Sequence, residues 1–122
     1  MEHMRILVID DEPVICSGCT MILSDIGHTV QSCMTCGEGI ENMKKNHYDL
    51  VLLDLKLPDK DGLELLKTVN SNSLSRIIVM TGYATVQCAI NSMKLGAVDF
   101  LQKPFTEEEL LETVNNVVEL YS

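Results

Sequence analysis

The sequence predicts an α/β fold in which five parallel strands form one doubly wound sheet that is covered by five helices. Strand signals and helix signals alternate five times along the 122 residues, and the chain contains no repeats or low-complexity segments. Three of the strand runs are continuous and aliphatic, which is typical of parallel strands buried on both faces. Of the two strand orders usual for such a sheet, we expect 2-1-3-4-5, which places the first strand beside the third.

The expected strands are short apolar runs, and the segments between them carry helix start and stop signals. The strands are placed at Arg5–Asp10, His28–Cys33, Leu50–Asp54, Arg76–Thr81 and Asp99–Gln102. A proline in the first turn, pairs with capping-box spacing and glycines at helix ends mark the helices. These residues are Pro13, the pairs Thr35/Glu38, Asp61/Glu64 and Thr106/Glu109, and the glycines Gly27 and Gly96.

Apolar residues at helical spacing predict which helix faces pack in the core. In the first helix they are Ile15, Cys19, Ile22, Leu23 and Ile26. In the fourth helix they are Val86, Ala89, Ile90 and Met93, and in the last they are Leu111, Val114, Val118 and Tyr121.

Composition predicts a single domain over residues 1–122 with an aliphatic core, because 46% of the residues are hydrophobic and none is Trp. The net charge of −9 argues against direct binding of nucleic acid. Without an apolar stretch of membrane-spanning length or a signal-peptide pattern, we expect a cytoplasmic protein with no membrane partner. Residues 1–3 precede a second methionine, Met4, and are either native or a remnant of expression.

Five cysteines are an odd number, which argues against a disulfide framework. Cys16 and Cys19, with Cys33 and Cys36, have the spacing of a zinc ribbon. The first pair, however, falls within an amphipathic helical run, and small buried thiols explain Cys19 and Cys33 at least as well. The sequence leaves a redox or metal role for the four residues open.

Reactive side chains stand where four of the runs end. Asp10 and Asp11 follow the first run, Asp54 ends the third, Thr81 the fourth, and Lys103 follows the fifth. Because the carboxyl ends of parallel strands lie along one edge, these groups are expected in one crevice. Three carboxylates together repel one another unless a cation intervenes, and Mg²⁺ suits their oxygen ligands. A helix cap would explain one of them, Asp11, but not the set.

The same residues indicate phosphoryl chemistry. Asp54, held beside a metal ion, can act as a nucleophile toward phosphorus and form an acyl phosphate. The ammonium of Lys103 can stabilise the phosphoryl oxygens, and the Thr81 hydroxyl can donate a hydrogen bond to them.

Together these residues resemble the receiver domain of response regulators in two-component signalling, over nearly the whole chain. The matching elements are Val8–Glu12, Leu52–Asp54 with Leu57-Pro58 and Asp61-Gly62, Met80–Gly82, Gly96-Ala97 and Lys103–Phe105. Segments 81–86 and 93–101 are most similar to receivers of enhancer-binding transcription activators. The resemblance implies a flavodoxin-like fold and a regulatory domain that is not an enzyme, although it catalyses its own phosphorylation and dephosphorylation.

The resemblance also implies roles for individual residues. Asp54 would be the phosphoacceptor, and Mg²⁺ or Mn²⁺ would be held by Asp10, Asp11, Asp54 and the backbone carbonyl of Lys56. Thr81 and Lys103 would bind the phosphoryl group, and the Lys103–Pro104 peptide bond would be cis. Thr81 would move toward the phosphate, and Phe100, at the position of the family's aromatic switch residue, would follow. Many members have Tyr there, and Phe lacks its hydroxyl.

The implied partners are a sensor histidine kinase or phosphotransfer protein, and an output domain or downstream protein. Phosphorylation would reshape the surface of the fourth helix, fifth strand and fifth helix, where homodimerisation is a hypothesis. The exposed residues expected there are Gln87, Asn91, Lys94 and Gln102. The bulk of Lys56 and Tyr83 predicts an acyl phosphate with a longer lifetime than small residues at these positions would give.

Three other functions compete with this one. A flavodoxin-like FMN carrier needs a phosphate loop after the first strand, where this chain has Asp10-Asp11-Glu12. A phosphatase with an aspartyl nucleophile needs Asp-x-Asp, and residues 54–56 lack the second acid. A degenerate receiver that binds proteins without phosphorylation would not require the intact set of acids, threonine and lysine.

Overall fold

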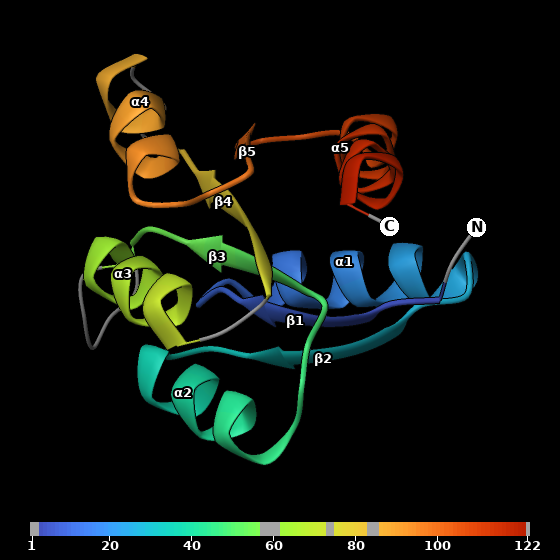
Figure 1. Ribbon diagram of the computed structural model, residues 1–122. Coiled ribbons are helices and arrows are strands. Elements are labelled where there is room, and N and C mark those ends of the chain that lie inside the picture. Colours follow the sequence, from blue (N-terminus) through green and yellow to red (C-terminus); the bar gives the residue numbers. More distant parts are fainter. Residues whose placement is uncertain (1–2, 57–61, 73–74, 83–85, 122) are drawn as a thin grey trace.

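The computed structural model describes residues 3–56, 62–72, 75–82 and 86–121. Its five strands form one parallel sheet in the order β2-β1-β3-β4-β5, so the predicted fold and strand order are confirmed (Figure 1). The strands are β1 Arg5–Ile9, β2 Thr29–Cys33, β3 Leu50–Asp54, β4 Arg76–Thr81 and β5 Asp99–Gln102.

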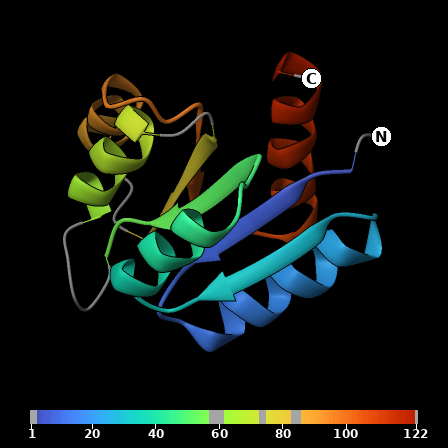
Figure 2. The same ribbon diagram turned by 60° about the horizontal axis from the view of Figure 1, so that its bottom comes forward.

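Helices cover both faces of the sheet. Helices α1 and α5 pack on one face, and α2, α3 and α4 pack on the other (Figures 1 and 2). Their bounds are α1 Pro13–Asp25, α2 Cys36–Lys45, α3 Gly62–Asn72, α4 Val86–Lys94 and α5 Glu107–Tyr121. Within the described ranges, no helix is both long and apolar enough to cross a bilayer.

The central strands divide their side chains between two hydrophobic layers. In β3, Leu50 and Leu52 face α1 and α5, whereas Val51 and Leu53 face the other three helices. All residues of β3 are buried. Because neighbouring side chains of a strand point to opposite faces, a strand between two helical layers has no polar position until it ends. Reactive side chains on the central strand β3 are therefore expected where the strand ends.

Capping boxes fix the starts of α2 and α5, as the sequence predicted. Thr35 Oγ1 accepts the backbone N–H of Glu38 at 3.1 Å. At α5 the exchange is reciprocal, because Thr106 Oγ1 accepts from the Glu109 N–H and Glu109 Oε1 accepts from the Thr106 N–H, both at 3.1 Å. The cap predicted at Asp61 lies outside the described residues.

Two glycines in the left-handed region follow helices α1 and α4. Gly27 has a φ of 99° and Gly96 a φ of 110°. A Cβ at Gly96 would also lie 2.3 Å from the Asn70 side chain of α3. Both predicted helix ends are thus confirmed, and Gly96 combines an unusual φ with a close approach.

The predicted core face of α4 is wrong for Ile90 and Met93. Their side chains are 41% and 46% exposed. The helix instead turns Cys88 and the buried Ser92 inward, and Leu95 just after it packs against the same layer. Ser92 Oγ donates to the Cys88 carbonyl at 2.9 Å, which satisfies its hydroxyl without a partner from the sheet.

The predicted core faces of α1 and α5 agree better with the structure than that of α4. Cys19 and Leu23 of α1 are buried, and Ile15, Ile22 and Ile26 pack against the same layer, as predicted. In α5 the most buried positions are Leu110, Val114 and Val117, whereas Leu111 and Val118 are half-buried. The inner face of α5 is therefore turned by about one residue from the predicted stripe, of which Val114 is the shared member. The side chains of Val86 and Tyr121 lie outside the described residues.

The four cysteines with zinc-ribbon spacing are buried in two separate layers. Cys16 and Cys19 pack beneath α1 and α5, whereas Cys33 and Cys36 pack on the opposite face of the sheet. Burial raises the pKa of Cys19 and that of Cys33 to about 12. Because zinc binds thiolates, this placement favours the buried-thiol interpretation.

Candidate functional site

The strand ends meet along one edge because the backbone ladder continues one residue past the strands. The Asp10 N–H donates to the Cys33 carbonyl at 3.1 Å, and the Lys103 N–H donates to the Thr81 carbonyl at 3.0 Å. Ile9 pairs with Leu53 in the register of β1 and β3, so the residues that follow them stand side by side. The predicted convergence of these residues is thus a consequence of strand order and register.

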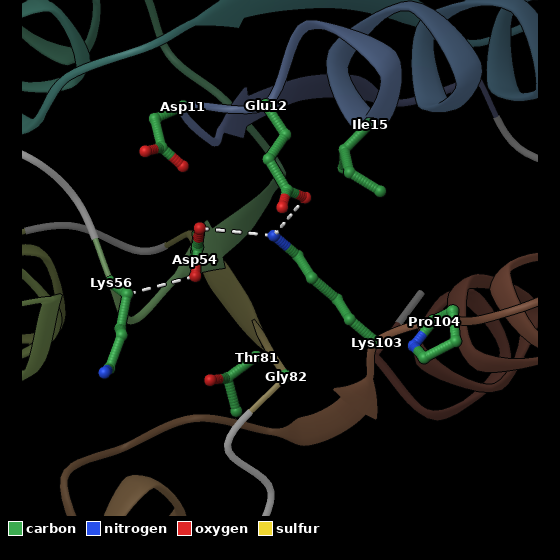
Figure 3. Close-up of a pocket in the computed structure, with 9 residues that line it drawn as sticks. All are labelled: Asp11, Glu12, Ile15, Asp54, Lys56, Thr81, Gly82, Lys103 and Pro104. Atoms are coloured by element: carbon green, nitrogen blue, oxygen red, sulfur yellow. Dashed lines mark hydrogen bonds and ion pairs between the residues drawn. The ribbon is translucent and has the colours of Figure 1, made fainter.

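An open cleft of about 510 Å³ lies at this edge (Figure 3). The loops after β1, β3, β4 and β5 form its walls. Its lining residues are Asp11, Glu12, Ile15, Asp54, Lys56, Thr81, Gly82, Lys103 and Pro104.

Three of the carboxylates at the cleft lie close enough together to share a metal ion. One oxygen from each of Asp10, Asp11 and Asp54 lies within 4.8 Å of the other two. Asp10 and Asp54 are buried, whereas Asp11 is exposed. Burial raises the pKa of Asp10 and the Asp54 charge adds to the rise, while hydrogen bonds from Lys103 and the Glu12 N–H oppose it. This set of hard oxygen donors, open to solvent on one side, fits a divalent cation that keeps some of its water.

Lys103 reaches back across the cleft to the acids. Its Nζ lies 2.6 Å from Asp10 Oδ2, 3.1 Å from Glu12 Oε2 and 3.2 Å from Asp54 Oδ2. Burial alone would lower the pKa of Lys103, but the three carboxylates, Asp10 first, outweigh it and hold the pKa above its usual value. Lys103 is therefore a charged ammonium within reach of Asp54, not a solvated surface lysine.

Asp54 is held by both of its oxygens. Oδ1 accepts the backbone N–H of Lys56 at 3.0 Å, and Oδ2 accepts from Lys103 Nζ at 3.2 Å (Figure 3). The side chain ends β3 and points into the cleft, so its carboxylate is oriented and reachable. A carboxylate in this setting can attack an electrophile that enters from the cleft.

The start of α1 differs from the cap considered for Asp11. The N-cap residue is Glu12, and within the described part of the chain its side chain makes no capping hydrogen bond. Asp10 Oδ1 instead accepts the Glu12 N–H at 2.9 Å, while Pro13 occupies the first turn as predicted. Asp11 is thereby left to face the cleft.

Thr81 and Pro104 border the cleft on the side of β4 and β5. The Thr81 side chain is buried at the end of β4, across the cleft from Glu12 (Figure 3). The Lys103–Pro104 peptide bond is cis, which is the isomer that the resemblance implies. Phe100 is half-buried in β5 and packs against the layer beneath α2, α3 and α4. It therefore lies in the strand that leads to Lys103, next to α4.

Comparison with known proteins decides the family. The sequence model of one protein family, the response regulator receiver domain, matches residues 6–115, which is most of the chain. The chain belongs to this family. Its function as a regulatory phosphoacceptor domain of two-component signalling, which the resemblance implied, is confirmed.

Relatives of this receiver include regulators of transcription. The transcriptional regulatory protein DltR of Streptococcus agalactiae is 38% identical over 112 residues, which are 91% of this chain and 50% of DltR. The chain spans about half the length of the curated relatives that it matches.

Solved structures agree with the fold of this receiver. A CheY-like receiver domain protein from Methanospirillum hungatei JF-1 has a TM-score of 0.91 and 32% identity, covering 98% of this chain and 96% of that one. The beryllofluoride-activated receiver domain dimer of NtrC4 has a TM-score of 0.90 and 36% identity, covering 97% and 98% of the two chains. NtrC4 is an enhancer-binding regulator, so the resemblance to receivers of that class is confirmed.

The predicted residues Asp10, Asp11, Asp54, Thr81 and Lys103 all lie in or beside the cleft, but the sequence did not single out Glu12. Glu12 was named only as part of Val8–Glu12 and of Asp10-Asp11-Glu12, without a role of its own. Its contact with Lys103 arises because its side chain, at the N-cap of α1, turns into the cleft instead of capping the helix, which the sequence does not indicate.

Proposed function

We propose that Asp54 of this receiver accepts a phosphoryl group from a sensor histidine kinase, a phosphotransfer protein or a small phosphodonor. The observation that supports this most directly is the placement of Asp54 Oδ2 at 3.2 Å from Lys103 Nζ, in the lining of the cleft and next to the carboxylates of Asp10 and Asp11. An oxygen of Asp54 attacks phosphorus, the bond from phosphorus to the donor breaks, and an acyl phosphate results.

We assign the metal ligands to Asp10, Asp11, Asp54 and the backbone carbonyl of Lys56. A bound Mg²⁺ or Mn²⁺ would offset the repulsion between the attacking carboxylate and the anionic donor. Asp54 is oriented for this role by the Lys56 N–H at 3.0 Å. The proposal rests on the donor chemistry of the three acids, each of which offers a carboxylate oxygen toward the same space.

Lys103 and Thr81 are the proposed groups that bind the transferred phosphoryl. Lys103 brings a positive charge to the side of Asp54 and can stabilise the charge that develops on the phosphoryl oxygens. The hydroxyl of Thr81, at the end of the neighbouring strand β4, can donate to another of these oxygens.

We infer that the phosphorylated state is signalled through Thr81 and Phe100 to the surface of α4, β5 and α5. Phosphorylation adds about −1.5 to −2 charge, which draws donors toward Asp54. The side chains of Ile90, Asn91, Met93 and Lys94 are exposed on α4, and two of them are apolar. A second copy of this chain can cover these apolar side chains, and the NtrC4 relative is a dimer when activated by beryllofluoride. We propose homodimerisation on this face after phosphorylation.

What the receiver controls depends on the full-length protein. Since the relatives are about twice as long as this chain, we propose that the receiver controls an output domain or a separate partner in transcription. A cytoplasmic location is consistent with its five free thiols, all within the described ranges.

The test is incubation with acetyl phosphate and Mg²⁺, followed by intact mass measurement. The wild type should gain the mass of one phosphoryl group, and Asp54→Asn should gain none. Asp25→Asn, which alters an exposed acid at the far end of α1, is the matched control and should behave as the wild type. A wild type that binds proteins without gaining this mass would support the degenerate receiver instead.

A further inference from the structure

Glu12 contacts Lys103 although it is not one of the three acids grouped as possible metal ligands. It is the N-cap of α1, a position where short side chains usually accept backbone N–H groups. Its longer side chain turns instead into the cleft, where Oε2 lies 3.1 Å from Lys103 Nζ (Figure 3). The start of α1 thus forgoes a side-chain cap, and the charge of Glu12 is directed at the lysine.

The ammonium of Lys103 has three N–H donors, and three carboxylate oxygens surround it. They belong to Asp10 at 2.6 Å, Glu12 at 3.1 Å and Asp54 at 3.2 Å. A phosphoryl oxygen on Asp54 therefore competes with these carboxylates for Lys103.

Glu12 is the carboxylate that can release Lys103 most easily. Its side chain is 56% exposed, whereas those of Asp10 and Asp54 are 0% and 5% exposed. A freed Glu12 is solvated by water at once, but a freed Asp10 would remain buried without its counter-charge. The donor that Asp54 accepts can pass to the phosphoryl group that Asp54 carries, so any further contact of this group with Lys103 has to come from Asp10 or Glu12. The exchange should therefore take place at Glu12.

We propose that Glu12 is a positioning residue that holds Lys103 in the unphosphorylated receiver and gives it up when Asp54 is phosphorylated. A contact made in only one of two states stabilises that state. The Glu12–Lys103 pair therefore opposes phosphorylation and sets how strongly the receiver responds to a given phosphodonor. This inference rests on the proposed function of Asp54 and Lys103.

The test measures the affinity for beryllofluoride, a mimic of the phosphoryl group, with Mg²⁺ held at saturation so that metal binding does not vary. Glu12→Gln should bind beryllofluoride about two- to fivefold more tightly than the wild type, the size expected for a partly exposed ion pair. The matched control is Glu41→Gln, which also removes a carboxylate and its contact with a lysine, Lys44, but on the surface of α2. It should leave the affinity unchanged.

Glu12→Asp separates the contact from the charge. Aspartate keeps the negative charge at the cleft but is one methylene too short to reach Lys103 in its present place. If release of Lys103 is the cause, Glu12→Asp should bind beryllofluoride more tightly, as Glu12→Gln does. If Glu12→Asp matches the wild type and only Glu12→Gln gains affinity, reduced repulsion is the cause and the inference is overturned. The urea unfolding midpoint of each variant shows that a gain is not a change in folding.

The outcomes also distinguish this inference from the proposed function. If the wild type binds beryllofluoride and gains a phosphoryl group, but both Glu12 variants match Glu41→Gln, only the role of Glu12 is refuted. If the wild type neither binds beryllofluoride nor gains a phosphoryl group, the proposed function fails, and the role of Glu12 fails with it.

Discussion

The balance between the carboxylates in the cleft and the ammonium of Lys103 determines whether the site attracts a divalent cation. Lys103 contacts three carboxylates, and the fourth, Asp11, lies within 4.8 Å of two of them through its own oxygen. One ammonium does not offset four carboxylates, so the cleft retains an attraction for a divalent cation. Asp11 is exposed, so it can be replaced without disturbing the core.

Asp11→Asn should weaken Mg²⁺ binding at least about tenfold, because a ligand loses its charge while the fold is kept. Titration calorimetry of Mg²⁺ into each protein measures the effect. Asp25→Asn should retain the wild-type affinity. Equal Mg²⁺ affinity in Asp11→Asn and the wild type would remove Asp11 from the metal site.

His28 makes a pH-dependent contribution to stability far from the cleft. It is buried beside the start of β1 and β2, where its Nδ1 accepts the Met4 N–H at 3.0 Å. Burial, and to a smaller extent the nearby His3, lower its pKa in the folded protein. Because the unfolded chain then binds a proton more readily, the neutral His28 costs stability as pH falls below about 6.5, the unfolded value.

His28→Asn should reduce the loss of stability on acidification, because its side-chain oxygen can accept the Met4 N–H but does not titrate. Urea unfolding at pH 7.5 and pH 5.5 gives the loss of unfolding free energy on acidification, which is compared between the wild type and His28→Asn. A loss on acidification equal to that of the wild type would show that His28 does not titrate with folding.

At the scale of helices and strands, the sequence predicted most of what positions the site and missed what packing decides. Strand ends and caps follow local rules, and those within the described residues lie within about one residue of their predicted places. The inward face of α4 does not follow such rules, because this short helix has apolar residues on both sides. It buries Ser92, whose hydroxyl donates a hydrogen bond within the helix. Hydrophobicity alone could not favour that face over Ile90 and Met93. Glu12 was missed for a different reason: it stands at the N-cap of α1, and nothing in the sequence indicates that its side chain turns into the cleft instead of capping the helix.

Packing of α2 on the sheet depends on a glycine. A Cβ at Gly39 would lie 2.6 Å from Cδ1 and 3.2 Å from Cγ1 of the fully buried Ile9. Gly18 of α1 has no such neighbour within 4 Å among the described atoms. Alanine at either position gains the same helix propensity, so a comparison of the two isolates the clash.

Gly39→Ala should be less stable to urea than Gly18→Ala by about 1–3 kcal/mol, the usual cost of overpacking. Adding Ile9→Val, which removes the Cδ1 atom, to each alanine variant should reduce the difference in unfolding free energy between them. Equal free energies of unfolding for the two alanine variants would mean that α2 shifts at no cost.

For the molecule as a whole, strands β4 and β5 connect the cleft to the exposed surface formed by α4, β5 and α5. Thr81 pairs with Gln102 across these strands, and Phe100 contacts the layer beneath α4. The positions predicted to be exposed there, Gln87, Asn91 and Lys94 on α4 and Gln102 on β5, are all exposed. The apolar Ile90 adds to this surface, and a second copy of the chain can bury it.

Sedimentation of the wild type with Mg²⁺ and beryllofluoride should therefore show a dimer, and without beryllofluoride a monomer. Ile90→Lys should remain monomeric in both conditions, because its charge would be buried in the contact. Met21→Lys changes a residue that is 63% exposed on α1 and should dimerise as the wild type does. A dimer of Ile90→Lys would place the contact on another face.

The central claim is that Asp54 forms an acyl phosphate, and intact mass measurement after exposure to acetyl phosphate and Mg²⁺ tests it most directly. We predict one added phosphoryl group on the wild type, lost on treatment with hydroxylamine and absent from Asp54→Asn. No added mass on the wild type, or equal added mass on Asp54→Asn, would contradict the account.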